Sequence, residues 1–379
     1  MSVKYKIAAY IYPQALKMPT GVSMLTLNMV RVLAKNPEVE LRLLAGADEL
    51  EPDGTLPPEL KFDGIPVVPL PWHRGTREAI WLASDWPPVD RYLPEDFWVY
   101  STMETYVPAR RCRRIVTVHH LEPRVKAAPF SGPALRQWRQ DFRLRKAIRT
   151  ADLIVAQSTF TRDAVVREFS APMERMQVVG SGVDDELLES PPGSAALEIA
   201  KFGPYIISPG AFQLRKGTDY LFAMARELQR RGSPLKIVCP FGLCGLPPFT
   251  DEVNKLPNVI GLDYISREDL LNMIRGAVCM VIPSRLEGFG LTAIESMALG
   301  TPVIASNNTA LPETLGGAGV LVDPANATEI ADEVERLLNI PEHRADLVAR
   351  SRRRAKDYTW TKCMNRLLVG IQKHEDFHG

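Results

Sequence analysis

Short apolar runs alternate with segments of helical periodicity along most of this chain, and this alternation limits the fold more than any other feature. Between the runs lie stretches with helical spacing of apolar residues, such as 159–169 and 291–299. Repeated strand–helix alternation is the pattern of parallel sheets covered by helices. We therefore predict an α/β fold with strands at 6–12, 40–45, 115–118, 153–156, 176–179, 205–208, 236–239, 259–262, 278–282 and 302–306.

The length and one turn-rich stretch predict two domains. At about 150 residues per domain, a chain of 379 residues divides into two. The stretch 190–204 is rich in Pro and Gly and interrupts the alternation, which restarts after it. We place a first domain at 1–195, a second at 196–357 and a closing helical segment at 358–379. Ligands bind at the carboxyl ends of parallel strands, so we expect the site in the cleft between the domains.

Composition and charge are those of an ordinary globular chain. Hydrophobic residues make up 45%, charged residues 24%, and the formal net charge is +1, so no chain-wide field favours nucleic acid. Basic residues gather in the first domain, where they form either a solvated helix face or a surface for anionic lipid or a charged acceptor. These clusters contain Arg110, Arg111, Arg113, Arg114, Arg136, Arg139, Arg143, Arg145, Lys146 and Arg149, and they lack the interleaved aromatics of a nucleic-acid site.

Cysteine usage and the absence of long apolar runs predict a cytoplasmic protein. Five cysteines occur, without a C-x-x-C pair, which fits free thiols in a reducing compartment. The apolar stretch after Met1 is too short for a signal peptide, and no run reaches the roughly 18 apolar residues of a membrane span. We expect a cytoplasmic chain, and peripheral contact with the inner face of a membrane is the alternative in which the basic residues of the first domain form a lipid-binding surface.

The segment 284–295 is the densest functional signal. It follows a buried strand and runs into a helix, and Gly288 and Gly290 allow a tight turn. Amides at the start of that helix can hold an anion such as a diphosphate. Glu287 and Glu295 flank this anion site, and carboxylates there make sense if they accept hydrogen bonds from a sugar on one side and a ribose on the other. The alternative is a pair of ordinary surface glutamates.

A basic turn follows an earlier strand and suits the same anion. Gly210 begins it, and Arg215 and Lys216 would offset the charge of a departing diphosphate. The alternative is an exposed basic turn. In the first domain, His119 ends a strand and is either a site residue or a satisfied structural histidine. Gly21 opens the first helix and offers a second approach to phosphate.

These residues resemble the signature of the family 4 glycosyltransferases. Glu287 and Glu295, with Gly-Phe-Gly between them, follow Pro283-Ser284 as in that family. The resemblance covers nearly the whole chain and implies a GT-B fold of two Rossmann-like domains, with the last helix crossing back to the first domain. It departs from the family's pattern at His120, where an Asp is common, and at Thr20, where a Gly is common.

The resemblance and the motifs together imply the site. The catalytic residues would be Glu287, His119, Arg215 and Lys216, and the resemblance alone places the nucleobase near Tyr264, Ile265 and Leu270. The donor would be held by Gly21, Gly210, Arg215, Lys216, Tyr264, Ile265, Leu270, Glu287, Gly288, Phe289, Gly290, Leu291, Thr292 and Glu295.

The expected reaction is transfer of a hexose, with retention of configuration, from a nucleotide-sugar to a glycan, a lipid-linked or a small-molecule acceptor. We favour GDP-mannose over UDP-glucose-type donors from the likeness of residues 117–123 to mannosyl-transferring relatives. The resemblance implies no metal and no other cofactor, and the chain has no Asp-x-Asp motif. Nucleic acid is not an expected partner.

Other functions remain open at this stage. Gly288, Gly290 and Ala293 fit the G-x-G-x-x-A pattern of a dehydrogenase, but no acidic residue follows at 305–310 as a ribose ligand. A catalytically inactive GT-B protein that only binds a sugar nucleotide is the second alternative. A GT-B nucleotide-sugar epimerase is the third.

Overall fold

The chain forms two units, each built on its own parallel sheet, which confirms the α/β class. The computed structural model describes residues 3–17, 20–62, 64–94, 96–121, 134–190, 202–210, 212–244 and 249–378, apart from the side chains of 134–140, 250 and 378. The first unit holds the described residues up to 121, from 134 to 181 and from 360 onward. The second unit holds those from 182 to 359.

Seven parallel strands form the sheet of the first unit, in the order β3-β2-β1-β4-β5-β6-β7. The order reverses at β1, where Ile7 lies opposite both Leu41 and Trp98. Open parallel sheets bind ligands at the carboxyl ends of strands beside such a reversal. The strands are β1 (Tyr5–Tyr10), β2 (Val39–Gly46), β3 (Val67–Leu70), β4 (Trp98–Ser101), β5 (Arg113–Val118), β6 (Leu153–Ala156) and β7 (Met176–Val178).

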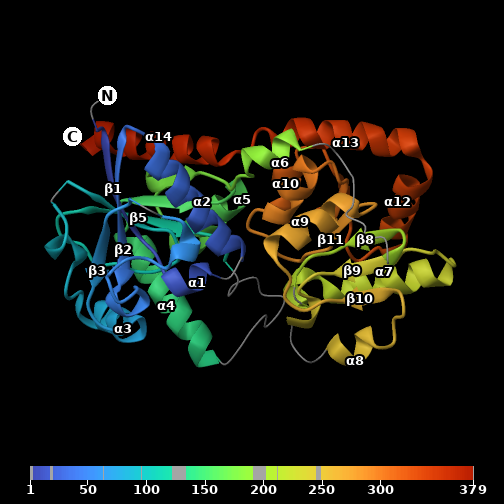
Figure 1. Cartoon of the computed structure of the whole chain (residues 1–379), viewed down its shortest axis with the longest axis horizontal. Helices are drawn as coiled ribbons and strands as arrows, with labels where there is room; N and C mark the ends of the chain where they lie inside the picture. Colours follow the sequence, from blue (N-terminus) through green and yellow to red (C-terminus); the bar gives the residue numbers. More distant parts are fainter. Residues whose placement is uncertain are drawn as a thin grey trace. The chain divides into compact units, whose positions relative to one another are not determined.

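The helices of the first unit begin where local capping favours them. α2 starts at Gly21 because the Thr20 and Ser23 side chains cap each other's backbone N–H groups. α14 belongs to this unit although it closes the chain, and it packs on α2, β6 and β7 (Figure 1). The helices are α1 (Pro13–Leu16), α2 (Gly21–Lys35), α3 (Arg74–Ser84), α4 (Ala134–Thr150), α5 (Thr159–Phe169) and α14 (Trp360–His378).

Six parallel strands form the sheet of the second unit, in the order β10-β9-β8-β11-β12-β13. Successive strand residues face opposite sides, so Ile207 packs in one core cluster with α9 and α10, whereas Ile206 packs in another with α7 and α12. Both faces of this sheet are therefore covered. The strands are β8 (Tyr205–Ile207), β9 (Lys236–Cys239), β10 (Val259–Gly261), β11 (Met280–Ile282), β12 (Val303–Ser306) and β13 (Val320–Val322).

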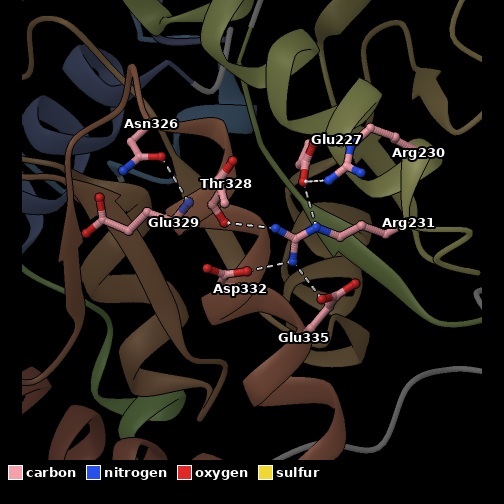
Figure 2. A network of polar contacts seen from close by, with 8 residues as sticks. All are labelled: Glu227, Arg230, Arg231, Asn326, Thr328, Glu329, Asp332 and Glu335. Carbon is pink, nitrogen blue, oxygen red and sulfur yellow. Dashed lines mark hydrogen bonds and ion pairs between the residues drawn. The ribbon is translucent and has the colours of Figure 1, made fainter.

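An ion-pair network ties two helices of the second unit together. Arg231, at the C-terminus of α7, donates to Glu227 on its own helix and to Asp332 and Glu335 on α12 (Figure 2). Its Nη2 also meets the Thr328 carbonyl at 3.4 Å. The helices of this unit are α6 (Asp185–Glu189), α7 (Thr218–Arg230), α8 (Thr250–Val253), α9 (Arg267–Gly276), α10 (Leu291–Ala298), α11 (Leu311–Leu315), α12 (Ala327–Asn339) and α13 (Pro341–Ala355).

The division between the units falls at Ser181, earlier than the boundary at 195 that the turn-rich stretch suggests. Val183 and Leu187 pack in the core of the second unit, and the Val183 N–H donates to the Tyr358 carbonyl (2.9 Å). Core packing therefore assigns this segment, whereas the turn-rich residues 191–201 lie outside the described residues. The chain returns to the first unit at Trp360, close to the predicted 358.

Candidate functional site

The corner between β11 and α10 has the geometry that the sequence predicts. β11 ends at Ile282, the chain turns through 283–290, and α10 begins at Leu291. Gly290 adopts φ 97°, a left-handed conformation that favours glycine, and no side chain caps the helix. Gly290, at the N-cap, has no side chain that could accept from the first amides of α10, which leaves the helix N-terminus suited to an anion.

Glu287 lies in this corner as an ionised carboxylate with one oxygen engaged. Its Oε1 accepts hydrogen bonds from Lys216 Nζ (2.7 Å) and from the Ser284 hydroxyl (2.8 Å). Burial acts to raise the pKa of Glu287, but the charges of Lys216 and Arg215 outweigh burial and lower it. Within the part of the chain that the structure describes, Oε2 has no hydrogen-bond partner, so it can accept from a ligand hydroxyl.

The basic turn after β8 packs directly on this corner. The Arg285 N–H donates to the Arg215 carbonyl (2.9 Å), and Arg215 Nη1 donates to the Leu286 carbonyl (3.3 Å). Gly217, with φ 70°, allows this approach, because a Cβ there would lie 1.9 Å from the Pro283 carbonyl oxygen. The two segments that the sequence singled out thus meet in one site of the second unit.

Gly210 lies beside the lysine that reaches the carboxylate, and its positive φ favours glycine at this position. Its φ is 135°, and a Cβ at this position would lie 3.7 Å from Cδ and Cε of Lys216. The lysine stem therefore runs alongside the backbone of Gly210 before its ammonium meets Glu287.

Glu295 is buried more deeply than we would expect of a residue that binds a ribose at an open site. The residue is 1% exposed, and Oε1 pairs with Arg267 Nη2 of α9 at 2.8 Å. Burial raises the pKa of Glu295, while Arg267 acts to lower it. Among the described residues, its buried Oε2 has no hydrogen-bond partner. A buried carboxylate oxygen without a partner is costly, which makes a ligand hydroxyl there favourable.

The three residues expected near a nucleobase differ in how far their side chains are exposed. Tyr264 is 51% exposed, and its ring lies 5.9 Å from that of Phe241. Ile265 is half-buried, whereas Leu270 is only 6% exposed and packs in the core. Phe241, just beyond β9 with φ 63°, is an aromatic partner that sequence reasoning missed.

The remaining residues of the corner differ in exposure. The Phe289 side chain is 8% exposed and packs edge-on against the Tyr358 ring (5.3 Å), so only its backbone can face a ligand. Gly288, Leu291 and Thr292 are half-buried.

Three residues that support the corner escaped the sequence analysis. Thr309 Oγ1 accepts from the Glu287 N–H (3.2 Å), and its own φ of 53° places it in a sparsely populated region. Arg285 pairs with Asp219 (Nη2 to Oδ2, 2.6 Å) and so fixes the other side of the turn. No residue-type pattern marks either contact, because both depend on strands brought together by the sheet.

In the first unit, His119 is a buried neutral histidine at the end of β5. Its Nε2 meets the Thr102 carbonyl at 3.0 Å, and its backbone N–H donates to Glu104 Oε1 (2.7 Å). A carbonyl only accepts, so Nε2 carries the proton and Nδ1 is left as an acceptor. Burial lowers the pKa of His119, although Glu104 acts to raise it. Gly21 is exposed, and a Cβ there would meet no atom within 4 Å.

The basic clusters of the first unit are partly paired. Arg143 pairs with Glu78 (2.9 Å) and Lys146 with Asp85 (2.5 Å), whereas the side chains of Arg136 and Arg139 lie outside the described residues. Membrane contact stays a prediction. None of the five cysteines forms a disulfide.

The residues that the structure describes contain no group of three or more His, Cys, Asp or Glu side chains that could hold a metal ion. Over the same residues, every helix is too short or too polar to cross a bilayer.

Two family models match the chain, one over each half. Residues 19–187 match the model described as Glycosyltransferase Family 4, and residues 194–354 match the model described as Glycosyl transferases group 1. Together with the two Rossmann-like parallel sheets, these matches define a glycosyltransferase of the GT-B class. The chain belongs to the family 4 glycosyltransferases.

Relatives with assigned activities are distant. O-antigen chain mannosyltransferase B of Escherichia coli is 25% identical over 283 residues, which span 72% of this chain and 73% of that protein. MMP alpha-(1->4)-mannosyltransferase of Mycolicibacterium hassiacum is 29% identical over 279 residues, 68% of this chain and 65% of that protein, just under two thirds. Sucrose-phosphate synthase of Thermosynechococcus elongatus shares the fold, with a TM-score of 0.70, 18% identity and coverage of 99% and 100%.

Proposed function

We propose that this glycosyltransferase moves a hexose from a nucleotide-sugar, by preference mannose from GDP-mannose, to a glycan, lipid-linked or small-molecule acceptor, with retention and without a metal. The observation that carries the proposal is the ionised Glu287, which shares one oxygen between Lys216 and Ser284 and keeps the other for a ligand. The preference for mannose is supported by the names of the two mannosyltransferase relatives.

The donor diphosphate would bind Arg215, Lys216 and the first amides of α10. Lys216 already has a carboxylate partner, so its charge is held in place before the phosphate arrives. Negative charge grows on the diphosphate as the bond to the sugar breaks, so contacts to it strengthen toward the transition state. Arginine adds a planar, permanently charged group suited to phosphate oxygens.

The carboxylates would hold the sugar and the ribose. Glu287 Oε2 would accept from a sugar hydroxyl, and Glu295 Oε2 from a ribose hydroxyl. The exposed Tyr264 ring beside Phe241 offers an apolar face for the base. In the first unit, His119 Nδ1 would accept a hydrogen bond from a hydroxyl of the donor sugar, and Gly21 would lie close to a phosphate of the donor.

Retention follows if the acceptor hydroxyl attacks on the side from which the diphosphate leaves. In that case the departing phosphate takes the acceptor proton, and no covalent intermediate with the protein forms. Glu287, bound to Lys216 and Ser284, serves to position the sugar in this scheme.

A thermal-shift panel with GDP, UDP and ADP tests the proposal. A nucleotide that binds the folded chain raises the melting temperature by mass action, and we expect GDP to give the largest shift. GDP-mannose should then be consumed with an added glycan acceptor. No shift with any nucleotide would reject the proposal, and a shift without turnover or hydrolysis of the matching sugar nucleotide would favour an inactive binding protein.

A further inference from the structure

Two exposed tryptophans form a pair at the carboxyl edge of the first unit's sheet. Trp72 and Trp86 are 41% and 46% exposed, with ring centroids 5.6 Å apart and planes tilted by 41°. Trp72 lies just beyond β3, and Trp86 lies just beyond α3. Aromatic rings usually bury most of their surface, so an open pair marks a binding surface.

The backbone of Trp72 is held in an unfavourable conformation. Its φ of 62° lies in the left-handed region that bulky residues avoid. Arg77, which is 0% exposed, fixes it by donating through Nη1 to the carbonyls of Trp72 (2.6 Å) and Pro71 (3.2 Å). Gly46 leaves room for this guanidinium, because a Cβ there would lie 3.0 Å from both terminal nitrogens. Buried structure thus overrides a local preference in order to present this ring.

Hydrogen-bonding groups without excess charge flank the pair. The side chain of His73 is 77% exposed, and its Nε2 lies 3.8 Å from Asp48 Oδ2. The guanidinium of Arg74 lies 4.8 Å from the centre of the Tyr12 ring, and the positive charges of Arg74 and Arg77 offset the negative charges of Asp48 and Glu49. A balanced set of donors and acceptors beside apolar rings suits a neutral polyhydroxy ligand better than a phosphate or an anionic lipid.

We propose that Trp72 and Trp86 bind a hexose ring of a neutral glycan and form an acceptor subsite. The C–H groups on one face of a hexose carry partial positive charge and pack on the negative face of an aromatic ring. The hydroxyls at the edge of that hexose reach His73 and Asp48. Naming this glycan the acceptor rests on the proposed function, whereas its binding needs no donor.

Calorimetric titration of the full chain with mannotetraose, maltotetraose and cellotetraose, without nucleotide, tests this subsite. We expect at least one tetrasaccharide to bind, and Trp72→Ala and Trp86→Ala each to weaken it about fivefold or more. Phe377→Ala, which removes another exposed aromatic of the same unit, is the matched control and should bind as the wild type does. Trp72→Gly removes the same ring but relieves the left-handed backbone, so it should melt higher than Trp72→Ala and still lose binding.

Two results would overturn the subsite. One is that no tetrasaccharide binds the wild type, and the other is that binding survives unchanged in both alanine variants. Loss of binding to anionic vesicles in these variants, with glycan binding unaltered, would instead assign the pair to a membrane. Nucleotide thermal shifts on the same variants separate this proposal from the donor site, because those shifts should be equal in the wild type and in Trp72→Ala.

Discussion

Lys216 and Glu287 are 71 residues apart in sequence, yet their Nζ and Oε1 atoms lie 2.7 Å apart. The sheet order explains the contact: β8 and β11 are neighbours, so the turns that follow them emerge side by side. The pair places two opposite charges where a donor diphosphate and a sugar would meet, with little rearrangement needed on binding.

The first prediction concerns the carboxylate of this pair. Glu287→Ala should lower kcat at least about 100-fold, because it removes the sugar contact and leaves Lys216 without its fixed partner. Glu342→Ala, an exposed glutamate in the first turn of α13, is the matched control and should keep wild-type turnover. Activity of Glu287→Ala within about threefold of the wild type would show that the site is placed wrongly.

The second prediction concerns the close approach of the two turns. Gly217 and Gly232 have nearly the same φ, 70° and 69°, but only at Gly217 would a Cβ collide with another residue's backbone. Gly232→Ala should therefore cost about 1 kcal/mol of unfolding free energy and Gly217→Ala at least about 3 kcal/mol. Urea unfolding of the two variants measures the difference, and equal costs would mean that the turns separate easily.

The sequence predicts the strands that carry long β-branched or aliphatic runs. The predicted strands 153–156 and 236–239 coincide with β6 and β9, and the helix 159–169 coincides with α5. β3, β4 and β13 were missed, and β3 contains Pro69, which its edge position tolerates. Strands of three or four residues give only a weak periodic signal, although the equally short β6 and β9 were found.

The candidate site shows the same division between local and non-local information. The turn at Gly290 and the position of Glu287 follow from neighbouring residues, so the motif predicts them. Arg267 and Thr309 reach Glu295 and Glu287 from other elements, and nothing in the sequence near the motif marks them. Such contacts depend on the packing of α9 and on the loop after β12, which only the tertiary structure supplies.

The third prediction concerns the ion-pair network of Figure 2. The side chain of Arg231 is 18% exposed and joins α7 to α12, whereas that of Arg230 is 72% exposed and, among the described residues, pairs with Glu227 alone, on its own helix. Arg231→Met should therefore lower the melting temperature more than Arg230→Met. Added salt should narrow this gap, because it screens exposed charges. Calorimetry of both variants at low and high salt measures the effect. An equal fall of the melting temperature in the two variants would show that the ion pairs between Arg231 and α12 do not stabilise the fold.

The last prediction is that the two site glutamates respond to pH in opposite directions. Burial acts to raise the pKa of Glu287, but Lys216 and Arg215 lower it below the ordinary 4.5, so its stabilising effect is present above about pH 4.5 and is lost as pH falls through the folded value. Burial raises the pKa of Glu295 and outweighs the charge of Arg267, which acts to lower it. The contribution of Glu295 to the free energy of unfolding therefore falls as pH rises from about 4.5 through the pKa of the folded state. Melting temperatures of Glu287→Gln and Glu295→Gln, compared with the wild type between about pH 4 and pH 7, measure both effects. As pH rises, the melting temperature of the wild type should increase relative to that of Glu287→Gln and decrease relative to that of Glu295→Gln. An increase relative to both variants would mean that Glu295 is stabilised as a carboxylate and that its buried Oε2 already has a partner.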